Sequence, residues 1–232
     1  MNENIISYYS NKTMVMHESK LSVFLNRFSK NYSREKTASE AGLRGDICLD
    51  IACGDGELLT KYLYKQYIKA EGVDISKSLI EKAKSKKREN CSFYIADIED
   101  FVEKAIKAHK KYDTVYMLAI LEHIPWPSLF LEKIFKIVKK GGHIVVETPN
   151  VAWFPHRVSL LLGNFPVTAP TVGVIPGVYD EHIRFFTFDT MNKITVKNGF
   201  KLIKIDSSGK FRFIKRLLPK LLSPNIVAVY EK

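Results

Sequence analysis

Short apolar runs alternate with longer amphipathic segments along most of the chain after residue 45. The apolar runs are rich in β-branched residues and cover positions 47–52, 70–75, 92–96, 114–119 and 143–148. Between them, apolar residues recur at helical spacing in segments 56–66, 77–88, 99–109 and 128–139. The last of these helices is expected to stop at Gly141 and Gly142. Alternating strands and helices predict an α/β fold whose parallel sheet is covered by helices on both faces.

Residues 149–186 interrupt this alternation. The region holds five of the nine prolines of the chain and also carries Trp153, His156 and Arg157. Prolines at this density disfavour long helices and central strands. We interpret the region as a lid insertion that follows the fifth strand and covers the strand ends.

The alternation resumes after the insertion. A helix is expected at residues 188–198 with Gly199 as its stop, and strands are expected at 200–206 and 226–231. Only the basic, helix-like segment 210–222 separates these two strands. We therefore expect them to form an antiparallel end of the sheet.

The composition is that of a single globular domain of 232 residues, 46% hydrophobic and 26% charged. We expect an N-terminal helical cap at residues 1–45, followed by the main domain at residues 46–232. No apolar run approaches the roughly 20 residues that cross a membrane. Three cysteines without a CxxC pair predict neither disulfides nor a metal site, and a cytoplasmic setting fits best.

The net charge of +11 favours anionic partners without identifying one. Residues 201–232 contain eight Lys or Arg and two Asp or Glu, so this tail supplies +6 of the total. Five apolar residues of the tail share one helical face, opposite several cations: Phe211, Ile214, Leu217, Leu218 and Leu221. We expect this face to dock on the sheet and leave the cations in water. The alternative is peripheral contact with an anionic membrane through 210–222.

A glycine-rich turn between the first strand and first helix is the sharpest motif, Leu49-Asp50-Ile51-Ala52-Cys53-Gly54-Asp55-Gly56-Glu57. Its glycines let a ligand approach the backbone, and the helix start offers unpaired N–H groups. Asp74 ends the second strand, where a carboxylate can bind both hydroxyls of a ribose. Asp97 follows the third strand, where it can accept a hydrogen bond from an adenine amino group. A dinucleotide site would need a third glycine where the chain has Leu59.

These strand ends resemble those of the class I S-adenosylmethionine-dependent methyltransferases. The resemblance continues through Leu121-Glu122-His123-Ile124-Pro125 and Lys140-Gly141-Gly142. It implies a Rossmann-like, seven-stranded, mostly parallel sheet with an antiparallel terminal strand, and S-adenosyl-L-methionine as cofactor. One departure is Ala52, where the family pattern usually has glycine, and we expect this methyl group to be a mild change.

The resemblance also implies which residues bind the cofactor. The turn residues would hold its methionine part, and the acids and their following isoleucines would hold the nucleoside. The implied cofactor-binding residues are Asp50, Ala52, Gly54, Gly56, Asp74, Ile75, Asp97 and Ile98.

The insertion resembles the lid of a ubiquinone-biosynthesis-like subgroup of methyltransferases, also described as types 11 and 12, which includes O-methyltransferases. The resemblance implies a small-molecule or glycan intermediate as the acceptor, methylated at oxygen. The segment after the fourth strand lacks the Asn/Asp-Pro-Pro-aromatic motif that binds base amines. Nucleic acid is therefore a disfavoured partner, although an RNA- or membrane-associated methyltransferase stays open.

Two histidines are candidate catalytic bases, because a hydroxyl acceptor benefits from a base whose pKa lies near neutral pH. His123 follows the fourth strand, and His182 lies in the insertion between Glu181 and Arg184. The competing interpretations are a helix-entry residue packed beside Pro125 for His123 and a hydrogen bond within the lid for His182. A methyltransferase-like partner protein without chemistry is the alternative function. The sequence does not determine the acceptor or the oligomeric state.

Overall fold

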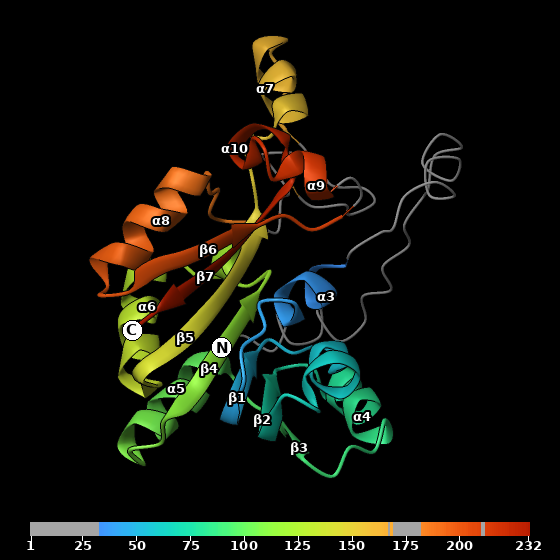
Figure 1. Cartoon of the computed structure of the whole chain (residues 1–232), viewed down its shortest axis with the longest axis vertical. Coiled ribbons are helices and arrows are strands. Elements are labelled where there is room, and N and C mark those ends of the chain that lie inside the picture. The colour runs from blue at the N-terminus through green and yellow to red at the C-terminus, as the bar shows by residue number, and fades with distance from the viewer. Residues whose placement is uncertain (1–32, 167, 169–181, 210–211) are drawn as a thin grey trace.

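The computed structural model describes residues 33–166, 168, 182–209 and 212–232, except for the side chain of Phe213. Seven strands form one sheet in the order β3-β2-β1-β4-β5-β7-β6 (Figure 1). The strands are β1 (Gly45–Ile51), β2 (Tyr67–Asp74), β3 (Cys91–Ile95), β4 (Tyr112–Leu118), β5 (Val138–Pro149), β6 (Lys201–Asp206) and β7 (Asn225–Glu231). Strands β1 to β5 pair in parallel, whereas β7 runs antiparallel to both β5 and β6. The predicted Rossmann-like sheet with an antiparallel terminal strand is confirmed.

The order of the strands sets the place of the site. From β1 the chain moves outward to β2 and β3, and then crosses back to β4 on the other side of β1. Because these strands are parallel, their carboxyl ends meet at one edge of the sheet. In open α/β sheets this reversal of strand order opens the crevice in which ligands bind.

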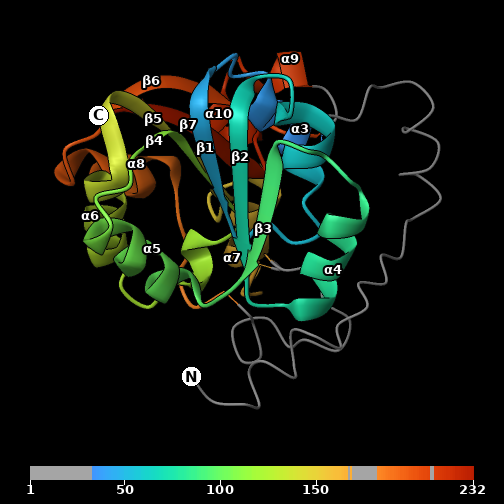
Figure 2. The same ribbon diagram turned by 90° about the horizontal axis from the view of Figure 1, so that it is seen from below.

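Two layers of helices cover the sheet (Figures 1 and 2). One face carries α5 (Ile98–Lys107), α6 (Pro127–Ile137) and α8 (Phe188–Lys197), and the other carries α3 (Arg34–Ser39), the π-helix η1 (Leu58–Leu63) and α4 (Lys77–Ser85). Successive strand residues alternate between the two cores: Val115 and Met117 of β4 pack under the first layer, and Tyr116 packs under the second. This period of two is what a strand buried on both faces requires.

Two predicted helices differ from the structure. The helix expected at 56–66 is the six-residue π-helix η1, in which the Thr60 hydroxyl donates to the Gly56 carbonyl at 2.7 Å. The helix before the fifth strand ends at Ile137, and β5 begins at the next residue. The glycine pair therefore lies inside β5 and does not stop the helix. A Cβ on Gly142 would meet the Asp113 carbonyl oxygen at 2.9 Å, so close strand packing explains this glycine.

The insertion contains one described helix, α7 (Phe154–Leu161). Its base is joined to the sheet by a parallel bridge between Asn150 and Phe186. The Asn150 side chain donates to the Ser223 carbonyl at 2.9 Å, which ties the insertion to the segment before β7. Residues 167 and 169–181, and residues 1–32 of the predicted cap, lie outside the described part of the chain. Within that part, no helix is long and apolar enough to cross a membrane.

The prediction of one amphipathic helix at 210–222 is wrong. Two four-residue helices are present instead, α9 (Arg212–Lys215) and α10 (Pro219–Leu222). The apolar side chains face solvent, with Leu217 77% exposed and Leu218 58% exposed, whereas Arg212 is buried. The leucines and Arg212 therefore differ from the expected arrangement, whereas Arg216 and Lys220 are exposed as expected.

An ion cluster around Asp206 explains why Arg212 is buried. The two carboxylate oxygens of Asp206 accept hydrogen bonds from the guanidinium groups of Arg212 and Arg216, with Nε–Oδ1 distances of 2.8 and 2.9 Å. The backbone N–H of Ser207 also donates to Asp206, and Arg212 pairs with Glu40 as well. Burial opposes ionisation of Asp206, but the hydrogen bonds from both arginines outweigh it and hold the pKa of Asp206 well below its usual range.

Removing this buried acid should destabilise the fold strongly. Asp206→Asn leaves Arg212 charged and nearly buried, which costs about 3–5 kcal/mol in comparable pairs. Urea unfolding at pH 7 should show this loss in the free energy of unfolding. Asp189→Asn, which removes the exposed Lys220 pair, should cost less than about 1 kcal/mol.

The comparison of wild type with Asp206→Asn also predicts how the stability difference depends on pH. Because the folded-state pKa of Asp206 is lowered, its contribution is present above the unfolded value of about 3.9 and fades as the pH falls below it. The difference between wild type and Asp206→Asn should therefore shrink on acidification. A difference that stayed constant down to pH 3 would contradict the ion-cluster account.

Candidate active site

The turn after β1 has the backbone expected of a ligand-binding loop. Ala52, Gly54 and Gly56 all have positive φ, at 56°, 54° and 71°. Ala52 therefore has a left-handed backbone conformation, which costs a residue with a side chain about 1–2 kcal/mol. The replacement of the family's glycine by alanine is a larger change than expected. A Cβ on Gly54 would meet nothing within 4 Å, which leaves this side of the turn open. A Cβ on Gly56 would lie 2.7 Å from Phe93, so packing explains that glycine.

Asp74 holds the turn against the end of β2. Its Oδ2 accepts a hydrogen bond from the Gly54 N–H, and its Oδ1 accepts one from the Ser76 N–H, both at 2.8 Å. A carboxylate has about four acceptor sites, so two remain for other donors. Asp74 is 8% exposed at the carboxyl edge of the sheet.

Asp50 lies deeper, on β1 between Gly72 of β2 and Tyr116 of β4. It is 3% exposed, and burial, followed by the charges of Glu35 and Asp74, raises its pKa well above the usual range. A buried acid of this kind is stabilised in its charged form by a cationic ligand.

Asp97 has a visible structural role. Its carboxylate caps α5 by accepting from the N–H of Glu99 at 2.8 Å and, less closely, from that of Asp100. Ile98 begins the helix, and Ile75 follows the end of β2; both are half-buried. The predicted nucleoside residues thus sit at the ends of neighbouring strands, while their contacts with a cofactor stay predictions.

The structure brings the two candidate bases together. His123 ends the short 3-10 helix η2 (Leu121–His123) after β4, and its ring centroid lies 4.9 Å from that of His182. The backbone N–H groups of Ile183 and Arg184 both donate to the Glu122 carbonyl at 3.0 Å. The Arg184 guanidinium donates to the Pro125 carbonyl, which fastens the end of the lid to the β4 loop.

Sequence reasoning missed two buried acids beside these histidines. Glu122 is 1% exposed, and its Oε1 lies 4.0 Å from His182 Nε2. Burial, and then the charge of Glu147, raises the pKa of Glu122 to about 8. Burial raises the pKa of Glu147, on β5, to about 7, although Arg34 acts in the opposite direction. For Glu147, a glutamate directly after the apolar run 144–146 was the available signal.

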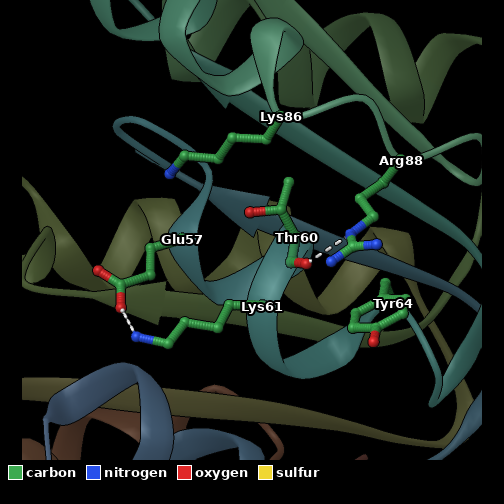
Figure 3. Close-up of a pocket in the computed structure, with 6 residues that line it drawn as sticks. All are labelled: Glu57, Thr60, Lys61, Tyr64, Lys86 and Arg88. Carbon is green, nitrogen blue, oxygen red and sulfur yellow. Dashed lines mark hydrogen bonds and ion pairs between the residues drawn. The ribbon is translucent and has the colours of Figure 1, made fainter.

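A separate pocket of about 400 Å³ lies on the outer side of η1 (Figure 3). Lys61 pairs there with Glu57 at 2.8 Å, and the Arg88 Nε donates to the Thr60 carbonyl at 2.9 Å. Lys86 and Tyr64 complete the lining. None of the predicted cofactor or catalytic residues lines this pocket, so we do not assign the cofactor to it.

The fold and the site define the class of protein. A family model described as a methyltransferase domain matches residues 19–205. The chain belongs to this family, and its fold is that of S-adenosylmethionine-dependent methyltransferases. The predicted class of enzyme is confirmed at this level.

Individual relatives refine the comparison. The ubiquinone biosynthesis O-methyltransferase of Coxiella burnetii (strain RSA 331 / Henzerling II) is 32% identical over 166 residues, which cover 70% of this chain and 67% of that protein. The protein of the same name from Proteus mirabilis (strain HI4320) is 33% identical over 134 residues. This second match covers 56% of this chain and spans about half of the relative, 53%.

Solved structures agree on the fold. Magnesium protoporphyrin IX methyltransferase from Synechocystis PCC 6803, with bound SAH, covers the whole of both chains at a TM-score of 0.65 and 15% identity. A SAM-dependent methyltransferase from Archaeoglobus fulgidus covers 92% of this chain and 100% of its own at a TM-score of 0.58 and 20% identity.

Proposed function

We propose that this protein transfers the methyl group of S-adenosyl-L-methionine to a hydroxyl oxygen of a small molecule. The observation that carries the proposal is the arrangement at the ends of the neighbouring strands β1 and β4. The Asp74-held glycine turn lies at the first, and the cluster of Glu122, His123 and His182 lies at the second. The first suits a nucleoside with a positively charged sulfonium, and the second suits an acceptor that must lose a proton.

The proposed cofactor contacts follow the strand ends. Asp50 and the turn residues Ala52, Gly54 and Gly56 hold the methionine part, whose charge complements the buried Asp50 carboxyl. Asp74 and Ile75 hold the ribose. The Asp74 carboxylate accepts two backbone hydrogen bonds, and its remaining acceptor sites are available to the ribose hydroxyls. Asp97 and Ile98 hold the adenine.

Methyl transfer from a sulfonium mainly requires that the protein align the two reactants. The methyl group of a sulfonium is already activated, so the enzyme has to place the acceptor oxygen in line with the bond between sulfur and methyl carbon. His123 or His182 takes the hydroxyl proton in this proposal, because an imidazole can accept a proton near neutral pH.

The two named relatives support oxygen as the acceptor atom, since both are O-methyltransferases of ubiquinone biosynthesis. Hydroxylated aromatic rings are therefore the first acceptors to test, followed by glycan intermediates. The alternative is a methyltransferase-like partner protein that performs no chemistry. The strained Ala52 favours this alternative, and methyl transfer from a labelled donor across acceptor pools separates the two.

Calorimetry with S-adenosylmethionine tests the cofactor site. Asp74→Asn should weaken binding by roughly 10- to 100-fold, because a hydrogen bond to a charged group contributes about 1.5–3 kcal/mol. The matched control is Asp55→Asn in the same turn, where the wild-type carboxylate pairs with Lys86. Thermal unfolding of both variants checks that the turn stays folded. Equal affinities of Asp74→Asn and wild type would remove Asp74 from the site.

We also propose peripheral contact with anionic membranes through residues 212–222. Leu217, Leu218 and Ile214 expose apolar side chains there, and Lys215 and Lys220 lie between and beside them. Apolar residues that penetrate the headgroup region, together with nearby cations, are the features that bind a protein to an anionic bilayer.

Sedimentation with vesicles that contain anionic lipid tests this contact. Replacing Leu217 and Leu218 with Ser should lower vesicle binding by at least about tenfold, since each buried leucine contributes roughly 1.5–3 kcal/mol. The control is Leu129→Ser, which changes an equally exposed leucine on α6. Binding that is lost equally in all variants, or never detected, would contradict the proposal.

A further inference from the structure

The cluster of Glu122, His123 and His182 has the composition of a metal site. The ligand atoms of the three side chains all lie within 4.8 Å of one another. In a tetrahedral site with metal–ligand distances of about 2.0–2.2 Å, ligand atoms are separated by roughly 3.3–3.6 Å. The three ligand atoms would therefore have to move together by about 1 Å on binding an ion.

A second observation points to a ligand in this cluster. Glu122 is 1% exposed, and among the described residues no donor meets either carboxylate oxygen with full hydrogen-bond geometry, although the nearby Thr148 hydroxyl acts to lower its pKa. Its Oε1 faces His182 Nε2 at 4.0 Å, which is too far for a hydrogen bond. Buried carboxylates are normally paired or coordinate metals, so this one has room for a cation.

The backbone preorganises the three side chains. The Glu122 carbonyl accepts from the N–H groups of Ile183 and Arg184, which fixes the segment that carries His182 against η2. His182 Nδ1 lies 3.0 Å from the Thr168 hydroxyl oxygen. When Nδ1 donates this hydrogen bond, the lone pair of Nε2 points to the side of Glu122, as in metal-binding histidines whose other nitrogen is held by a second group.

We propose that Glu122, His123 and His182 bind a divalent transition-metal ion. Two imidazoles and one carboxylate suit Zn²⁺, Co²⁺, Fe²⁺ or Mn²⁺. The set provides three protein ligands, and such sites keep open positions for water or a substrate oxygen. No metal site was predicted because His182 is remote from Glu122 and His123 in the sequence, and only the fold joins them.

The catalytic role of this ion rests on the proposed function, whereas its binding does not. With both imidazoles bound to the ion, neither histidine acts as the base. The ion would instead bind the acceptor hydroxyl and favour its deprotonation, with the proton passing to water. The oxygen then uses a lone pair to form the O–CH₃ bond while the S–CH₃ bond breaks. That electron pair goes to sulfur, which leaves as neutral S-adenosylhomocysteine. The oxidation state of the metal does not change.

Cobalt binding tests the proposal without any assay of activity. The full chain, prepared without a polyhistidine tag and stripped with chelator, is titrated with Co²⁺ and followed by visible absorption. One equivalent should give d–d bands that Zn²⁺ abolishes. Glu122→Gln, which preserves side-chain volume, and His182→Gln should each lower Co²⁺ affinity at least tenfold. His156→Gln is the matched control, since His156 lies in the same insertion and is bonded to the Asn150 carbonyl.

The outcomes separate this proposal from the proposed function. No Co²⁺ bands from folded protein, or affinity unchanged in the doubly substituted His123→Gln, His182→Gln chain, would overturn the metal site. S-adenosylmethionine affinity, measured on the same samples, should be nearly unaffected by these substitutions. Cobalt binding without cofactor binding would overturn the proposed function and leave the metal site standing. Methyl transfer by fully chelated protein would overturn the catalytic role of the ion.

Discussion

The carboxylate of Asp74 joins the two strand ends on which the candidate cofactor site depends. One oxygen binds the glycine turn after β1 at Gly54, and the other binds the start of α4 at Ser76. The turn has three residues with positive φ, one of which is an alanine, so its own backbone does not favour this shape. A single buried acid therefore fixes the geometry of the turn and still retains acceptor capacity. Asp74 lies beside the crevice where the strand order reverses, so its free acceptor sites are available to a ligand.

Electrostatics gives the site its second defining property. Asp50, Glu122 and Glu147 are all nearly inaccessible to solvent, and burial raises the pKa of each. Acids in this state bind protons unless a cation replaces them. A sulfonium cofactor beside Asp50 and a divalent ion beside Glu122 would each supply the missing charge. The net charge of +11, by contrast, describes the exterior and the tail, where cations such as Arg212 and Arg216 are held by Asp206.

Much of the fold could be predicted from the sequence, because strands buried on both faces produce apolar runs that few other structures share. The places of Asp74 and Asp97 at strand ends, and of Asp50 on the first strand, followed directly from these runs. Predictions failed where tertiary contacts decide local structure. Segment 210–222 has helical spacing, but the pair of Arg212 and Asp206 buries one cation, and Leu217 and Leu218 face solvent. Likewise, neither histidine alone indicated a cluster, since Glu122 and His182 meet only through the lid and the β4 loop.

A crystal structure of the chain with S-adenosylhomocysteine tests the central claim most directly, namely that the carboxyl ends of β1 to β4 form one site for cofactor and acceptor. We expect the ribose hydroxyls on Asp74, the amino acid part beside Gly54 and Asp50, and the sulfur facing Glu122, His123 and His182. Ligand density in the pocket of Lys61, Lys86 and Arg88, or a sulfur turned away from the histidines, would contradict the account.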